Sequence, residues 1–137
     1  MTTPLDIARE VYRRFCDGDL DGVIGLCSPD IEWVVNGPPD LEKCRAFRGH
    51  REVRQFFEIL GRSWEFSSFE TREFIAHGGT VVVLGEEAGR DKVKDADFSN
   101  RWAHVFDVRD GQVQRFREFL CCWFGGESPP EMSWGAG

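Results

Sequence analysis

The sequence has few of the features that mark membrane, secreted or nucleic-acid-binding proteins. No apolar run approaches the length needed to cross a bilayer, and residues 1–4 lead straight into an amphipathic segment with no signal peptide. Basic residues are outnumbered, with 17 Lys and Arg against 24 Asp and Glu, and the formal net charge is −7. No basic cluster alternates with aromatic residues. We therefore expect a cytoplasmic protein with no membrane and no nucleic-acid partner.

The cysteines lack any ordered spacing. There are five, an odd number with no spacing typical of a disulfide framework, at Cys16, Cys27, Cys44, Cys121 and Cys122. The chain also has no set of Cys, His and Asp residues with the spacing of a zinc site. We expect five reduced thiols, as in a reducing cytoplasm, with no metal and no cofactor.

Aromatic residues are abundant but unevenly distributed among types, with 12 Phe and 5 Trp against one Tyr. Such rings can fill a core or line a cavity. The 137 residues fit one domain, which would bury about two thirds of the surface of the unfolded chain. We expect a single domain over residues 1–137, with residues 125–137 as a tail rich in Pro and Gly, and a small, uncharged or hydrophobic ligand.

Apolar spacing in the first half of the chain predicts three helices and two short strands. Thr3 as the cap, Pro4 at the first position and Asp6 at the third are typical of a helix start. The first predicted helix begins at Pro4 and ends at Asp17-Gly18, the second follows Asp19 and ends before Ser28-Pro29, and the third covers residues 50–64. The two strands cover residues 31–35 and 46–48. The apolar stripe of the first helix includes Val11 and Tyr12, which marks it as a buried face.

Four strands are predicted in the second half, at residues 66–76, 80–87, 100–108 and 112–124. Residues 88–97 are charged without apolar periodicity and are predicted to form a mobile loop. Residues 81–84 are apolar on both faces of their strand, so helices should cover one face and a second subunit or sheet layer the other. The order of elements indicates an α+β fold in which a curved antiparallel sheet wraps the N-terminal helices as a cone with a hydrophobic cavity.

The last predicted hairpin places one histidine and one glutamate on an otherwise apolar face. A three-residue loop at residues 109–111 puts His104 opposite Phe116 and Trp102 opposite Glu118. The shared face then consists of Trp102, His104, Phe106, Phe116, Glu118 and Leu120. A two-residue turn would change the register by one and put His104 opposite Arg117, which would leave the pair on the surface.

An acid/base pair in an apolar wall is typical of a small pocket. Each residue alone is more often structural, since a buried histidine is more often a hydrogen-bonded core residue than a catalyst and a glutamate near a strand end often only faces water. Burial should raise the pKa of Glu118 from about 4.3 toward neutrality unless a protonated His104 offsets it. The predicted pocket walls, each of which could instead be core, are Trp33, Phe57, Trp64, Trp102, Phe106, Phe116 and Leu120.

Four short segments together resemble one superfamily. They are Gly18-Asp19-Leu20-Asp21-Gly22, Pro29-Asp30-Ile31-Glu32-Trp33, Phe47-Arg48-Gly49 and Val108-Arg109-Asp110-Gly111-Gln112-Val113. Their order and spacing over residues 4–124 resemble the nuclear transport factor 2-like superfamily, especially its SnoaL-like polyketide cyclase and ketosteroid isomerase branches. The resemblance implies a cystatin-like α+β barrel, a hydrophobic cavity and a homodimer packed through the outer face of the sheet.

The resemblance also implies an altered site. His104 falls where ketosteroid isomerases and many polyketide cyclases place an acidic residue, and Glu118 falls where the isomerases keep a small residue and some cyclases an acidic one. The tyrosine of the isomerases' first helix corresponds to Val11, and their catalytic base falls near Val35. Steroid isomerisation by the usual residues is therefore not expected, and the site residues of limonene epoxide hydrolases and of the dehydrochlorinase branch are not evident.

Two functions remain open at this point. As catalytic residues, Glu118 could remove an acidic carbon-bound proton while His104 donates to the developing enolate oxygen, which suits isomerisation or aldol-type cyclisation of a ketone or polyketide-like substrate. The same fold could instead serve as a non-catalytic binding or protein-interaction module, because fold does not fix function. Met132 and Trp134 in the tail are expected to dock across the cavity mouth or on a partner subunit.

Overall fold

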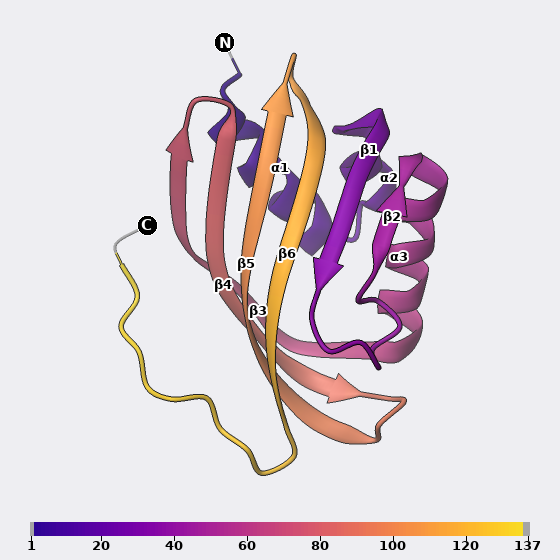
Figure 1. Ribbon diagram of the computed structural model, residues 1–137, viewed down its shortest axis with the longest axis vertical. Helices are drawn as coiled ribbons and strands as arrows, with labels where there is room; N and C mark the ends of the chain where they lie inside the picture. The colour runs from indigo at the N-terminus through magenta and orange to yellow at the C-terminus, as the bar shows by residue number, and fades with distance from the viewer. Residues whose placement is uncertain (1, 136–137) are drawn as a thin grey trace.

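Three helices lie against one face of a curved six-stranded sheet in the computed structural model, which describes residues 2–135 (Figure 1). The helices are α1 (Pro4–Cys16), α2 (Leu20–Gly25) and α3 (Gly49–Ser63). The strands are β1 (Cys27–Asn36), β2 (Ala46–Arg48), β3 (Trp64–His77), β4 (Thr80–Asp91), β5 (Ala96–Arg109) and β6 (Gln112–Phe124). The predicted α+β class, with a curved sheet around N-terminal helices, is confirmed.

Helix α1 begins as its sequence predicts. The Thr3 hydroxyl accepts a hydrogen bond from the Asp6 backbone N–H, and the Asp6 carboxylate accepts one from the Thr3 N–H. The helix buries Ile7, Ala8, Val11 and Tyr12 against the sheet. This packing brings one polar side chain, the Tyr12 phenol, to the inner face of the sheet.

The strand order is β2-β1-β6-β5-β4-β3, with β2 and β3 at the two edges of an open sheet. All neighbouring pairs are antiparallel except β1 and β6, which run parallel. The sheet is therefore antiparallel, as predicted, at every pair but this one. A parallel pair needs a long connection, and here most of the domain lies between the two strands along the chain.

The predicted mobile loop at residues 88–97 is wrong as well. Strands β4 and β5 continue through most of this segment and meet in a tight turn, in which the Asp91 carboxylate accepts hydrogen bonds from the backbone N–H groups of Val93 and Lys94. Arg90 forms ion pairs with Asp95 and Asp97, so the charges that hid the strand pattern lie on its surface. The longer hairpin extends the inner face of the sheet.

The β5–β6 hairpin places the predicted side chains on the inner face of the sheet, but its turn differs from the predicted one. Its turn consists of Asp110 and Gly111, both at positive φ (54° and 74°), which is the two-residue geometry typical of twisted hairpins. Strand β6 then carries one extra residue, Gln114, which has no partner on β5. This bulge restores the side-chain parity that a two-residue turn alone would have reversed.

The resulting register differs from the predicted one by two residues. His104 lies opposite Glu118 rather than Phe116, and Trp102 lies opposite Leu120 rather than Glu118. Because the shift is even, all of these side chains still share the buried inner face. The shift improves the predicted site, since it places the histidine and the glutamate directly side by side.

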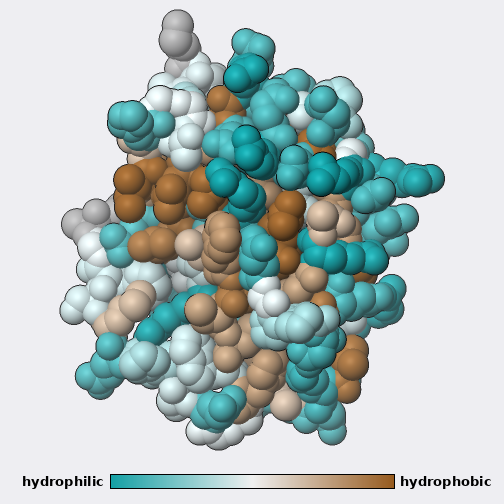
Figure 2. Space-filling view, in the orientation of Figure 1, coloured by the Kyte–Doolittle hydropathy of each residue, from teal (hydrophilic) through white to brown (hydrophobic). Residues whose placement is uncertain are grey.

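The outer face of the sheet carries apolar side chains that no helix of residues 2–135 covers. Neighbouring strands align Ile75 with Val82 and Val105, and Leu84 with Ala103 and Phe119. Ile75 is 54% exposed and Phe119 is 47% exposed. Figure 2 shows hydrophobic surface on this side of the molecule. We call these six residues the outer apolar patch.

The tail after β6 does not cover the cavity as far as the structure describes it. Trp134 and Pro129 are half-buried, Met132 is exposed, and Gly135 lies beside Glu73 of strand β3. None of the described tail residues lines the cavity. In residues 2–135, no helix has the length and apolar character needed to cross a membrane.

Candidate active site

A cavity lies between the inner face of the sheet and the helices, with about 510 Å³ of space free of protein atoms, counted out to its open mouth. Five of its fifteen lining residues can ionise, and they are Tyr12, Lys43, Glu87, His104 and Glu118. The other ten are apolar and mostly aromatic. The lining is therefore an apolar shell with a strip of ionisable groups.

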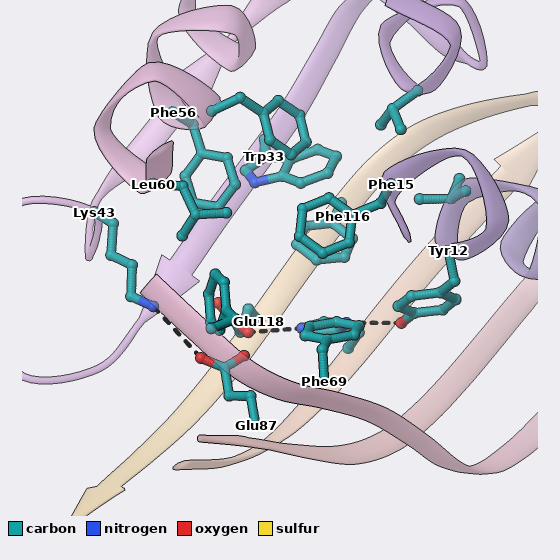
Figure 3. A pocket seen from close by; sticks show the side chains of 15 residues that line it. Tyr12, Phe15, Trp33, Lys43, Phe56, Leu60, Phe69, Glu87, Phe116 and Glu118 are labelled. Atoms are coloured by element: carbon teal, nitrogen blue, oxygen red, sulfur yellow. Dashed lines mark hydrogen bonds and ion pairs between the residues drawn. The ribbon is translucent and has the colours of Figure 1, made fainter. Parts of the chain in front are cut away.

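Three of the ionisable side chains form a continuous hydrogen-bonded line (Figure 3). The Tyr12 hydroxyl oxygen lies 2.7 Å from His104 Nδ1, and His104 Nε2 lies 2.7 Å from Glu118 Oε2. All three residues are buried and come from three elements, α1, β5 and β6. We call Tyr12, His104 and Glu118 the relay.

The protonation states of the relay follow from its geometry. Burial and the nearby Glu118 charge raise the pKa of the Tyr12 phenol well above its ordinary value, so the phenol keeps its proton. In the protonated imidazole, the Nδ1–H donates to the Tyr12 oxygen and the Nε2–H donates to the Glu118 carboxylate, so the Tyr12 O–H is free to point into the cavity. A proton can pass from His104 toward the cavity through the Tyr12 oxygen.

Glu118 is held in its ionised form. Burial alone would raise the pKa of this carboxyl, but attraction to His104, their hydrogen bond and attraction to Lys43 outweigh it, and the net pKa is lowered. The sequence left open whether a protonated His104 would offset the effect of burial on the pKa of Glu118. In the structure, the attraction to His104 does offset it.

The orientation of His104 is also fixed by a stacked aromatic ring. The Trp102 ring stacks on the imidazole with centroids 3.8 Å apart and planes 7° apart. Gly85 of β4 makes room for this arrangement, because a Cβ at that position would lie 2.2 Å from a Trp102 ring atom. The imidazole therefore has one orientation, set by two hydrogen bonds and one stacked ring.

A buried ion pair extends the polar strip beyond the relay. Lys43 lies in the loop between β1 and β2, and its Nζ is 3.8 Å from Glu87 Oε2 and 3.9 Å from the centroid of the Trp64 ring. Glu87 also accepts a hydrogen bond of 2.9 Å from Asn100 Nδ2. Burial raises the pKa of Glu87 to about 7, and attraction to Lys43 opposes this only in part.

The structure sorts the predicted site residues into two groups. His104, Glu118, Trp33, Phe57 and Phe116 line the cavity. The other four predicted wall residues are buried but lie outside the lining, and they are Trp64, Trp102, Phe106 and Leu120. Trp102 and Trp64 still contribute, since they support His104 and Lys43 from behind.

Three site residues were missed in the sequence. Tyr12 was assigned to the buried stripe of the first helix, and its phenol supplies the cavity with the group that was expected to be missing at Val11. Glu87 has the same strand parity as the buried Val83 and could have been found by that alternation. Lys43 lies in a loop and has no periodic signal.

Glu87 should make the stability of the protein depend on pH. Its pKa of about 7 in the folded state is above its ordinary value of 4.5, so between these values the folded protein holds a proton that the unfolded chain releases. The free energy of unfolding should therefore fall by ~1–3 kcal/mol as pH rises from 4.5 to 7.

We expect Glu87→Gln to remove most of this decline, measured by denaturant unfolding at several pH values. Glu58→Gln, at an exposed position on α3, is the matched control and should leave the decline in place. A decline of the same size in Glu87→Gln would show that another group causes it.

Comparisons with known proteins agree with this architecture. The SnoaL-like domain family matches residues 8–116. An NTF2-like protein from Burkholderia xenovorans LB400 is 27% identical, with 86% of this chain and 88% of that chain covered and a TM-score of 0.78. One from Burkholderia thailandensis E264 is 25% identical, with 88% and 92% covered and a TM-score of 0.79.

A protein from Mesorhizobium loti, named as a SnoaL-like polyketide cyclase, shares the fold at 16% identity, with 82% of this chain and 95% of that chain covered and a TM-score of 0.68. No curated protein sequence matches the chain.

Proposed function

Because the chain belongs to the SnoaL-like domain family, within the NTF2-like superfamily, we propose that it binds a small hydrophobic molecule in the cavity and acts on it by acid/base catalysis. The reaction that we propose is isomerisation or aldol-type cyclisation of a ketone or polyketide-like substrate. The observation that carries this proposal is the relay of Tyr12, His104 and Glu118 in the wall of an apolar cavity.

The relay suggests a role for each residue. The Tyr12 oxygen accepts a hydrogen bond from the protonated His104, and the Tyr12 O–H donates a hydrogen bond to the ketone oxygen and stabilises the enolate that forms there. Glu118, ionised and lining the cavity, accepts the carbon-bound proton. Its lowered pKa makes it a weak base, so the substrate needs an acidic C–H bond, such as one between two carbonyl groups.

The product then depends on where the enolate reacts. Return of the proton to a different carbon gives an isomer, and attack of the enolate carbon on a second carbonyl gives a ring. The apolar lining suits either course, because exclusion of water strengthens the hydrogen bond to the enolate oxygen.

One observation favours a second candidate function, which is ligand binding without catalysis. Both nitrogens of His104 already contact protein side chains, which is also how a purely structural buried histidine is satisfied. In that case the relay would only hold the cavity open and position a ligand.

The two functions are separated by a screen for turnover. We expect the wild-type protein to convert at least one member of a panel of ketones and polyketide-like substrates, followed by NMR, with a rate that depends on Glu118. Turnover that Glu118→Gln leaves unchanged would refute the assigned roles. The absence of turnover across the panel would leave the binding function.

We also propose that the protein is a homodimer that covers the outer apolar patch. Light scattering on the eluting protein at micromolar concentration should give twice the chain mass of 15.7 kDa. Phe119→Lys should shift the protein to monomer, because it places a charge inside the interface. Val93→Lys, in the exposed β4–β5 turn, is the control that should stay dimeric, and a 15.7 kDa wild-type species would contradict the proposal.

The thiols are consistent with the cytoplasmic location that we propose. All five cysteines are free in the structure. Burial raises the pKa of Cys27 and of Cys122 to about 12, so both thiols stay protonated and unreactive.

A further inference from the structure

The Lys43 end of the cavity has no assigned role in the reaction above, and its geometry points to a ligand group. The Lys43 side chain is 2% exposed, so its ammonium has lost most of its contact with water. Its distance of 3.8 Å to Glu87 Oε2 is an ion-pair distance but too long for a hydrogen bond. A buried ammonium in this position is best stabilised by an oxygen that approaches from the cavity.

A second donor lies in the same lining. The indole N–H of Trp33 is buried and has no hydrogen-bond partner in residues 2–135. Trp33 and Lys43 both line the cavity, and in Figure 3 the side chains of Phe56 and Leu60 lie between them. The Trp33 N–H has no partner and the Lys43 ammonium has an ion-pair contact without a hydrogen bond, so a ligand with acceptors, such as a carboxylate with its two oxygens, would satisfy both.

Protonation of Glu87 would allow a second negative charge to bind at this end of the cavity. The groups that face it are Lys43 from the β1–β2 loop, Asn100 from β5 and Glu118 from β6. Because its pKa is about 7, Glu87 accepts a proton near neutral pH at little cost in free energy. Once protonated, it no longer competes with a ligand anion for Lys43.

We propose that the Lys43 end of the cavity binds the carboxylate of a hydrophobic acid, and that Glu87 takes up a proton from the solution as the carboxylate binds. The ligand enters as its carboxylate, and an O–H bond forms on Glu87 with a proton that the buffer supplies, so the added negative charge is neutralised and the total charge of the site is unchanged. The carboxylate then pairs with Lys43 in place of Glu87, and the ligand enters an apolar cavity of an acidic protein without adding charge to it.

This inference rests on the proposed function, of which it names the substrate class. With the carboxylate at Lys43 and the reacting ketone at Tyr12, the substrate is a hydrophobic keto acid. The apolar side chains between the two ends would contact its carbon skeleton. Lys43 is then a residue that determines specificity, separate from the relay.

Binding of matched acids and amides tests the inference without any need for turnover. The probes are benzoic, 2-naphthoic and 4-phenylbutanoic acids, each compared with its own amide by isothermal titration calorimetry. We expect at least one acid to bind the wild-type protein about tenfold or more tightly than its amide. Lys43→Met should abolish that preference, whereas Lys92→Met, at an exposed position, should keep it. Amide binding and the thermal melt report whether Lys43→Met folds.

The role of Glu87 is tested by proton uptake. At pH 8, calorimetry in phosphate and in Tris should show uptake of about one proton per acid bound by the wild type, because Glu87 is mostly ionised in the free protein. Glu87→Gln should bind the same acid with no uptake. Uptake that persists in Glu87→Gln would overturn this role.

Failure of the inference is distinguishable from failure of the proposed function. If no acid binds more tightly than its amide, or the preference survives Lys43→Met, the inference is overturned even if simple ketones are converted. If the acids are preferred through Lys43 but no substrate is converted, the inference stands for a binding protein and the catalytic proposal fails.

Discussion

Turnover should fall by roughly a hundredfold or more when Glu118 is replaced by glutamine. The amide keeps the size of the carboxylate but can neither accept the carbon-bound proton nor stabilise a positive charge on His104. The effect should appear in kcat rather than in KM, because the lost interaction is made in the transition state. Steady-state kinetics on a substrate found in the screen measures both.

The same substitution should leave the fold intact. No charged partner is stranded, since His104 can be neutral and can still donate its Nε2–H to the amide oxygen, and we expect a loss of at most ~1–2 kcal/mol in the free energy of unfolding. His104→Ala provides the comparison, because it opens a cavity beside Trp102 and should lower that free energy by ~1–3 kcal/mol. A large loss of stability in Glu118→Gln would mean that its kinetics report misfolding.

Gly85→Ala should lower both stability and turnover although Gly85 touches no ligand. The added Cβ would lie 2.2 Å from the Trp102 ring and 2.5 Å from the Glu70 carbonyl oxygen, so the ring or the strands must move. Overpacking of this kind lowers the free energy of unfolding by ~1–3 kcal/mol. Since Trp102 supports the imidazole of His104, we expect a further loss of about tenfold or more in kcat.

Gly61→Ala is the matched control for this substitution. Its added Cβ meets no atom within 4 Å, and it lies in helix α3, so alanine there should raise stability slightly through helix propensity. Denaturant unfolding and steady-state kinetics on both variants separate a local effect on the relay from a general effect of a larger side chain. Full activity in Gly85→Ala would show that the stacked ring does not position His104.

The fold was predictable because local rules and packing agree over most of the chain. The capping box at Thr3, the helical spacing in α1 and α3, and the limits of strand β6 all follow from the sequence. The β4–β5 hairpin did not follow, because its strand ends carry surface ion pairs instead of apolar alternation. The predicted register of the last hairpin was wrong for another reason. A bulge at Gln114 compensates for a turn that is shorter than predicted, and neither feature can be recognised from the spacing of the apolar residues.

The site was predictable in part for similar reasons. His104 and Glu118 stood out because strand parity puts them on an apolar face, and that parity survives an even shift in register. Tyr12 was predicted to be a core residue, because the helical spacing of buried residues does not show which of them points a hydroxyl into a cavity. Lys43 reaches the cavity from a loop, and only the folded chain brings it to Glu87.

Proton exchange on a bound ketone is the most direct test of the central claim that the relay performs acid/base chemistry in the cavity. The measurement is deuterium incorporation next to the carbonyl of 2-tetralone in D₂O, followed by NMR. The wild-type protein should exchange these protons well above the protein-free rate, and Tyr12→Phe and Glu118→Gln should each return the rate to near that background. Exchange by the wild type at the protein-free rate, or by both variants at the wild-type rate, would contradict the account.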